Sequence, residues 1–142
     1  MCDIKIYTDG ACSGNPGKGG WGIVILKDNK QHEYYGREEN TTNNRMEMTA
    51  IIQGLSKCNN DSRINLFSYS KYVIKGIKDW LLNWKQNSWK TTTNKPIKNK
   101  DLWFLIDECI QQKPNCKFFY VKAHSTNLYN ERANYLAKYD NL

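Results

Sequence analysis

The chain has 142 residues, of which 39% are hydrophobic and 25% charged, with a net charge of +7. This length predicts a single domain over 1–142 with its own hydrophobic core. No apolar run approaches the roughly eighteen residues of a membrane span, and 1–6 lead directly into a strand pattern. We therefore expect an untargeted, cytoplasmic protein without a membrane partner.

The first third of the chain predicts an antiparallel meander of three strands. Residues 3–12 alternate polar and apolar side chains, and a loop rich in glycine and proline follows at 10–20. A second β-prone run covers 21–26, and after a turn at 27–30 a third strand is expected at 33–37.

A helix is expected after the polar, cap-like segment at 40–44, because Met46, Ala50, Ile51 and Leu55 recur at helical spacing up to Cys58. The later elements are expected as a strand at 64–68, helices at 70–79 and 80–86, a loop at 91–98, a helix marked by Leu102, Leu105, Ile106, Cys109 and Ile110, a strand at 117–122 and a helix at 130–139. The order β-β-β-α-β-α-α-α-β-α predicts an α/β (mixed α+β) fold with helices against a mixed sheet.

The positive charge is concentrated in one segment. Residues 69–100 hold eight lysines and a single acid, Asp79, and three tryptophans, Trp80, Trp84 and Trp89, lie among the lysines. Such a run is often a solvated helix face beside core tryptophans. Because the whole excess charge gathers here, we favour a surface that binds a polyanion.

Two acidic residues stand where metal-dependent phosphoryl chemistry would need them. Asp9 ends the first strand just before Gly10, and Glu47 lies near the start of the helix after the Asn-rich segment. Two divalent ions about 4 Å apart require carboxylates that converge from separate elements. Taken singly, however, Asp9 could form a turn and Glu47 could stabilise the helix start.

Longer motifs surround these acids, and they resemble the type 1 ribonuclease H family. The matching stretches are YTDGACSGNPGKGGWG (7–22), TTNNRMEMTA (41–50), SKYVIKGI (70–77), NKPIKNKDLW (94–103), VKAHS (121–125) and NERANYLA (130–137). They occur in the family's order along nearly the whole chain. The resemblance implies the ribonuclease H fold, a five-stranded mixed sheet flanked by helices.

The resemblance also implies a reaction, in which two magnesium ions activate water to cut the RNA strand of an RNA/DNA hybrid. Asp9 matches the aspartate that bridges both ions, and Glu47 matches the glutamate ligand. His124 matches a mobile histidine that assists the attack of water or the departure of product, although an exposed loop histidine is the alternative.

The resemblance further implies a set of substrate contacts. Cys12, Asn15, Asn43 and Asn44 match positions that read the 2′-hydroxyl and the minor groove, and Thr42 matches a DNA-phosphate pocket. Short neutral donors and acceptors can recognise a 2′-hydroxyl without reading the base. The alternative for Asn and Thr here is capping of the helix.

The basic segment at about 78–100 resembles the family's handle, which places cations along the duplex backbone. We expect Lys85 and Lys90 to contact phosphates and the three tryptophans to serve packing first. Lys71 replaces a glutamine of the family pattern, and it could strengthen a backbone contact or disturb minor-groove reading.

Two further carboxylate positions of the family are substituted. Tyr69 stands in SYSKYV where the family pattern resembles T-D-S-Q-Y-V, and Asn134 stands in NERAN where it resembles N-E-R-x-D. A phenol with an ordinary pKa of about 10 is neutral at pH 7, and an amide adds no charge. Asp61 should lie at the far end of its strand, so Glu131 is the only plausible replacement acid.

We therefore expect a monomeric, hybrid-binding ribonuclease H homologue whose hydrolysis is lost or strongly weakened. Asp9 and Glu47 would hold Mg²⁺, or Mn²⁺, weakly or as a single ion. Two alternatives stay open. One is an active enzyme with a remodelled metal site, and the other is a structural subunit of a ribonucleoprotein.

Overall fold

The computed structural model describes residues 3–122 and 127–138. A five-stranded sheet has the order β3-β2-β1-β4-β5, in which β1, β2 and β3 are antiparallel neighbours while β1, β4 and β5 are parallel. The elements are β1 (Asp3–Gly14), β2 (Gly17–Lys27), β3 (Lys30–Thr41), α1 (Asn43–Ser56), β4 (Arg63–Ser68), α2 (Lys71–Lys75), the π-helical turn η1 (Gly76–Trp80), α3 (Leu81–Gln86), α4 (Lys100–Gln112), β5 (Cys116–Tyr120) and α5 (Leu128–Lys138). The expected mixed sheet and element order are confirmed.

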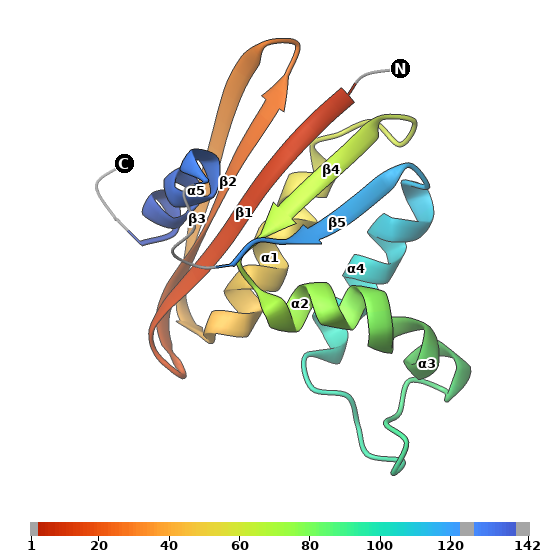
Figure 1. Cartoon of the computed structure of the whole chain (residues 1–142). Helices are drawn as coiled ribbons and strands as arrows, with labels where there is room; N and C mark the ends of the chain where they lie inside the picture. Colours follow the sequence, from red (N-terminus) through yellow and green to blue (C-terminus); the bar gives the residue numbers. More distant parts are fainter. Residues whose placement is uncertain (1–2, 123–126, 139–142) are drawn as a thin grey trace.

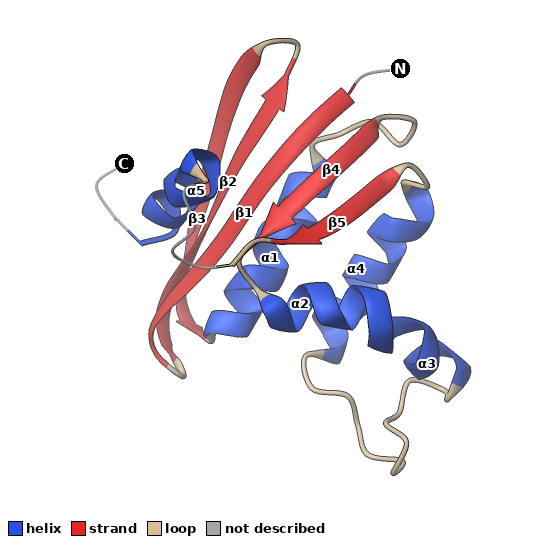
Figure 2. Cartoon of the chain, viewed as in Figure 1, coloured by secondary structure: helices blue, strands red, loops and turns tan. Residues whose placement is uncertain are grey.

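Helices cover the two faces of the sheet unequally. Helices α1 and α4 lie behind the sheet, while α5 crosses the front of β1, β2 and β3 (Figures 1 and 2). The front of β4 and β5, with the neighbouring part of β1, carries no helix (Figure 2). None of the described helices is long and apolar enough to cross a membrane.

The core lies between the sheet and the rear helices. Alternate residues of the central strands, such as Ile6 and Leu66, are fully buried against α1 and α4. Trp103 and Ile106 are the buried residues of α4, whereas Leu105 is 45% exposed. Leu105 was one of the apolar residues that marked this helix in the sequence, yet it is not buried, whereas Trp103, which was not among them, is fully buried.

The expected loop at 10–20 is wrong. Strand β1 continues to Gly14 and β2 begins at Gly17, so the hairpin needs only a short turn at Asn15 and Pro16. A glycine of this segment serves close packing instead, because a Cβ at Gly20 would lie 2.4 Å from the Ala137 carbonyl oxygen of α5, and Gly22, further along β2, is as close to Ala133. They allow α5 to dock directly on the sheet.

The bounds of other elements also differ from the expectation. Strand β3 covers Lys30–Thr41, which is longer than 33–37, and β5 ends at Tyr120, before 122. The helical segment after β4 contains the π-helical turn η1. Gly76 opens this turn, where a Cβ would lie 2.1 Å from the Trp103 ring, so the local helix geometry accompanies a tight contact with α4.

Candidate active site and nucleic-acid interface

Asp9 and Glu47 meet at a shared backbone donor. The Gly10 N–H donates to Asp9 Oδ1 at 2.9 Å and to Glu47 Oε1 at 3.0 Å. A Cβ on Gly10 would lie 2.4 Å from the Glu47 backbone nitrogen, so β1 and α1 approach this closely because residue 10 is glycine. The two carboxylates that the sequence singled out are therefore brought together.

The buried environment of Glu47 disfavours the charged form of its carboxyl group. It is 4% exposed, and burial raises its pKa well above the ordinary value, while the neighbouring Asp9 carboxylate raises that pKa further. Its Oε2 atom is buried without a hydrogen-bond partner among the described residues. Burial of an acceptor without a partner lowers the stability of the folded protein unless a proton or a cation binds to that acceptor.

Asn134 occupies the other side of Asp9. Its Nδ2 donates to Asp9 Oδ2 at 2.7 Å, linking α5 to the middle of β1. The amide therefore supplies the second oxygen of Asp9 with a neutral hydrogen-bond donor. This contact compensates part of the Asp9 charge without adding a second carboxylate.

Tyr69 also points toward α5. It follows β4 directly, and its hydroxyl donates to Glu131 Oε1 at 2.5 Å. Glu131 lies one helical turn before Asn134. Thr8 pairs with Ser68 across β1 and β4, so Asp9 in the middle of β1 lies near the end of β4, which Tyr69 follows. Side-chain hydrogen bonds thus link α5 to the middle of β1 and to the end of β4, and Asn130 adds two more, to the carbonyl oxygens of Thr8 and Phe67.

These contacts leave the site with two carboxylates at its centre. Among the described residues, no three His, Cys, Asp or Glu side chains gather in a way that could hold a metal ion. Glu131 is therefore not part of a three-acid cluster in this conformation. His124, the remaining expected catalytic residue, lies outside the described residues.

The expected substrate contacts converge beside the hairpin turn. Asn15 Oδ1 accepts the Asn43 N–H at 3.2 Å, and the Cys12 thiol donates to the Thr41 carbonyl oxygen at 3.3 Å. Thr42 caps α1 by accepting the Arg45 N–H at 3.2 Å. Capping and phosphate binding remain compatible for Thr42, because a hydroxyl can both accept and donate.

Sequence reasoning missed Arg45, which joins this surface to the base of the handle. Its guanidinium donates to both Asp101 carboxylate oxygens, at 3.0 and 2.6 Å, and to Asn99 Oδ1 at 3.3 Å. Hydrogen bonding to Arg45 lowers the pKa of Asp101. The sequence shows only that an arginine lies in the first turn of α1. It does not indicate that Arg45 contacts Asn99 and Asp101, which are more than fifty residues away.

The handle is held by its aromatic residues. Trp84 packs edge-on against Trp103 with ring centroids 5.3 Å apart, and Trp89 packs against Phe104 at 4.2 Å. The expected packing role of these tryptophans is confirmed. Lys71 and Lys90 are exposed, whereas Lys85 Nζ forms an ion pair with Asp107 at 3.0 Å.

Because Lys85 forms an ion pair and Lys90 forms none with the described residues, substitution of these two handle lysines should affect binding to different extents. If Lys90 contacts a phosphate of an RNA/DNA hybrid, as expected from the sequence, Lys90→Gln should flatten the plot of log affinity against log salt by about 0.9. Lys85→Gln should flatten it less, since Asp107 already compensates that charge. Lys57→Gln, at the residue that follows α1, is the control. Slopes identical to wild type in both handle variants would remove Lys85 and Lys90 from the interface.

Similarity to known proteins identifies the family of this chain. A family model described as RNase H matches residues 2–141. The chain belongs to the ribonuclease H family. Among curated ribonucleases H, the protein of Wolbachia sp. subsp. Drosophila simulans (strain wRi) is 49% identical over 96% of this chain and 93% of its own length. That of Pseudomonas savastanoi pv. phaseolicola is 46% identical over 94% of this chain and 89% of its own.

Solved ribonuclease H structures share the fold. LC9-RNase H1, a type 1 RNase H with the type 2 active-site motif, has a TM-score of 0.84 at 25% identity, over 96% of this chain and 71% of its own. LC11-RNase H1 in complex with an RNA/DNA hybrid has a TM-score of 0.71 at 27% identity, over 94% and 93% of the two chains. The family and fold expected from the motifs are thus confirmed.

Proposed function

We propose that the chain binds RNA/DNA hybrids as a ribonuclease H and that its hydrolysis of the RNA strand is lost or strongly weakened. One observation carries this proposal. The family's third and fourth carboxylate positions hold Tyr69 and Asn134, and both side chains are engaged in hydrogen bonds with acids, Glu131 and Asp9 respectively. Binding is supported by the intact substrate-facing residues and by the hybrid complex of the LC11-RNase H1 relative.

The residues present fit one divalent cation better than two. Glu47 Oε2 is a buried acceptor with no hydrogen-bond partner in the described part of the chain, and Asp9 accepts from the same backbone donor as Glu47. Both are the hard oxygen ligands that Mg²⁺ and Mn²⁺ accept, and substrate phosphate often completes such a site. Two carboxylates carry too little negative charge to balance two divalent ions. We therefore expect the site to keep one ion and lose the other.

The roles of the protein groups follow from this arrangement. Asp9 and Glu47 would hold the cation, which supplies positive charge against the scissile phosphate. Asn15, Asn43 and Asn44 would align the RNA strand through its 2′-hydroxyl groups, and the handle would hold the partner strand. Tyr69 fills the position where a carboxylate would bind a second ion. The protein should therefore still position the hybrid, while hydrolysis is weakened.

A labelled hybrid tests binding and hydrolysis separately. Anisotropy should give tighter binding of a 12-bp RNA/DNA hybrid than of double-stranded RNA at matched salt. Cleavage assays in Mg²⁺ and then in Mn²⁺ should give little or no product at protein concentrations that saturate the hybrid. Rapid metal-dependent cleavage would contradict the loss of hydrolysis, and equal affinity for both duplexes would contradict hybrid recognition.

One contact favours a second candidate, an active enzyme with a remodelled site. The Tyr69 hydroxyl holds a carboxylate, Glu131, one helical turn from Asn134. If Glu131 replaces the missing ligand, Glu131→Gln should abolish any Mn²⁺-dependent cleavage of the wild type. The exposed Glu108 on α4 provides the matched control, Glu108→Gln, and equal residual cleavage in both variants would rule out this role for Glu131.

A further inference from the structure

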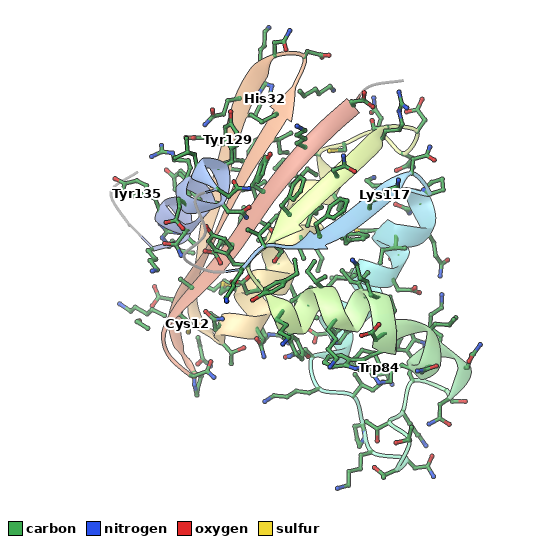
Figure 3. The ribbon with its side chains drawn as sticks, in the orientation of Figure 1. Cys12, His32, Trp84, Lys117, Tyr129 and Tyr135 are labelled. Atoms are coloured by element: carbon green, nitrogen blue, oxygen red, sulfur yellow. The ribbon has the colours of Figure 1, made fainter. Side chains whose placement is uncertain are left out.

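A second group of cations gathers far from the handle. Strand pairing places Lys5 of β1 beside Asn65 of β4 and Asn65 beside Lys117 of β5 on the front of the sheet. Adjacent strands are about 4.8 Å apart, so the two lysines lie about 10 Å from each other. Lys117 is labelled on this side of the sheet in Figure 3.

These residues line a hollow surface. A cavity of about 1070 Å³ extends from the turn between β2 and β3 across β1 to the starts of β4 and β5. The turn adds Lys27 and Lys30 to the lining. These two lysines pair across the turn on the face of β2 that carries Ile23 and Ile25, whereas Lys5 and Lys117 lie on the front of the sheet. Lys5, Lys30 and Lys117 are exposed, and Lys27 is half-buried.

The charge of the cavity is largely uncompensated. Within residues 3–122 and 127–138, none of its four lysines forms an ion pair, whereas Arg63 pairs with Asp3 at 2.9 Å. Asp28 is the other acid of the lining. Four unpaired cations against one unpaired acid attract a polyanion from solution.

The remaining lining groups fit nucleotides. Tyr129 of α5 borders the cavity, is 37% exposed and packs against Tyr7 with ring centroids 5.0 Å apart (Figure 3). Asn65 and Asn115 add side-chain amides that form no hydrogen bond in the described part of the chain. Amides pair with base edges, aromatic rings stack on bases, and lysines neutralise phosphates.

From this combination we infer that the front of β1, β4 and β5 is a binding surface for single-stranded nucleic acid. It is separate from the hybrid-binding site, because Lys5 precedes Asp9 by four residues, about 13 Å along β1, and the handle lies beyond the other end of the sheet (Figure 1). A flexible strand can enter a hollow and splay its bases, which a paired duplex cannot do. The combination of side-chain amides and an aromatic ring beside the lysines favours nucleotides over an acidic peptide, which would use the positive charge alone.

Two triple variants with equal loss of charge test this inference. The face variant carries Lys5→Gln, Lys30→Gln and Lys117→Gln, and the handle variant carries Lys90→Gln, Lys95→Gln and Lys98→Gln. Anisotropy is measured with labelled single-stranded oligo-dT and oligo-U 12-mers and with a blunt 12-bp hybrid. Circular dichroism and thermal unfolding establish that both variants are folded.

The face variant should lose at least tenfold in single-strand affinity and flatten the salt slope by about 2, since each lost contact contributes about 0.7. Its hybrid affinity should stay within twofold of wild type. The handle variant should lose hybrid affinity and change single-strand affinity less than threefold. Because the single-strand probes contain no hybrid, this result is independent of the proposed ribonuclease H function.

Three outcomes would overturn the inference. Unchanged single-strand affinity in the face variant would exclude this surface as the binding site. Equal losses of single-strand affinity in both variants would show that only the net charge of the protein matters. Binding of poly-glutamate to the wild-type face as tight as that of the oligonucleotides would assign the surface to acidic proteins instead.

Discussion

Tyr69→Asp combined with Asn134→Asp is expected to raise Mg²⁺-dependent cleavage of an RNA/DNA hybrid by at least two orders of magnitude. Each new carboxylate adds an attraction on the order of 4 kcal/mol to an ion about 4 Å away, before desolvation is subtracted. A net gain of about 3 kcal/mol in the transition state corresponds to roughly a hundredfold in rate. Single-turnover cleavage with saturating protein measures the chemical step directly.

The single variants and a silenced variant complete this experiment. Asn134→Asp alone should restore less cleavage than the double change, because Tyr69 still fills the third carboxylate position. Adding Asp9→Asn to the double variant should abolish the gained activity. If the double variant folds and binds the hybrid as wild type does but stays inactive, the missing charges are not what silences the site.

Glu47→Gln is expected to stabilise the metal-free protein by about 1 kcal/mol or more. The buried Glu47 carboxylate lies beside Asp9, and its Oε2 has no partner among the described residues. An amide removes the charge and supplies a donor toward Asp9. Urea unfolding in EDTA measures this gain in the free energy of unfolding.

The same variant should lose stabilisation by metal. Wild type in Mn²⁺ at a hundred times its Kd should gain about 2.7 kcal/mol, whereas Glu47→Gln should gain little. Glu108→Gln, which removes an exposed carboxylate on α4, should behave as wild type in both conditions. A Glu47→Gln protein that is less stable than wild type in EDTA, or equally stabilised by Mn²⁺, would contradict this account of the site.

Most secondary structure was predictable because each element has its own local pattern. The helical spacing from Met46 to Leu55 gave α1, and alternation along 3–12 gave β1. The error at 10–20 arose because glycine indicates both a turn and a close backbone approach. Only the docking of α5 against Gly20 distinguishes the two, and that contact joins segments more than a hundred residues apart.

The candidate site was predictable in its residues and not in its contacts. Asp9, Glu47, Tyr69 and Asn134 were all identified from motifs, and the structure brings Asp9, Glu47 and Asn134 into contact or onto a shared donor. The pairing of Tyr69 with Glu131 was not foreseen, although Glu131 had been singled out as the plausible replacement acid. The link from Arg45 to Asp101 had no local signal at all.

The sequence by itself determined the family and the order of the elements, and it predicted that a phenol and an amide replace two family carboxylates. These are properties of residue identity and of spacing over short stretches. Only the tertiary structure decided which groups those side chains meet and that Lys5, Lys27, Lys30 and Lys117 share one cavity. Strand order and helix docking bring distant residues together, so the part of the chain outside 69–100, whose charges balance along the sequence, still forms a cationic surface in space.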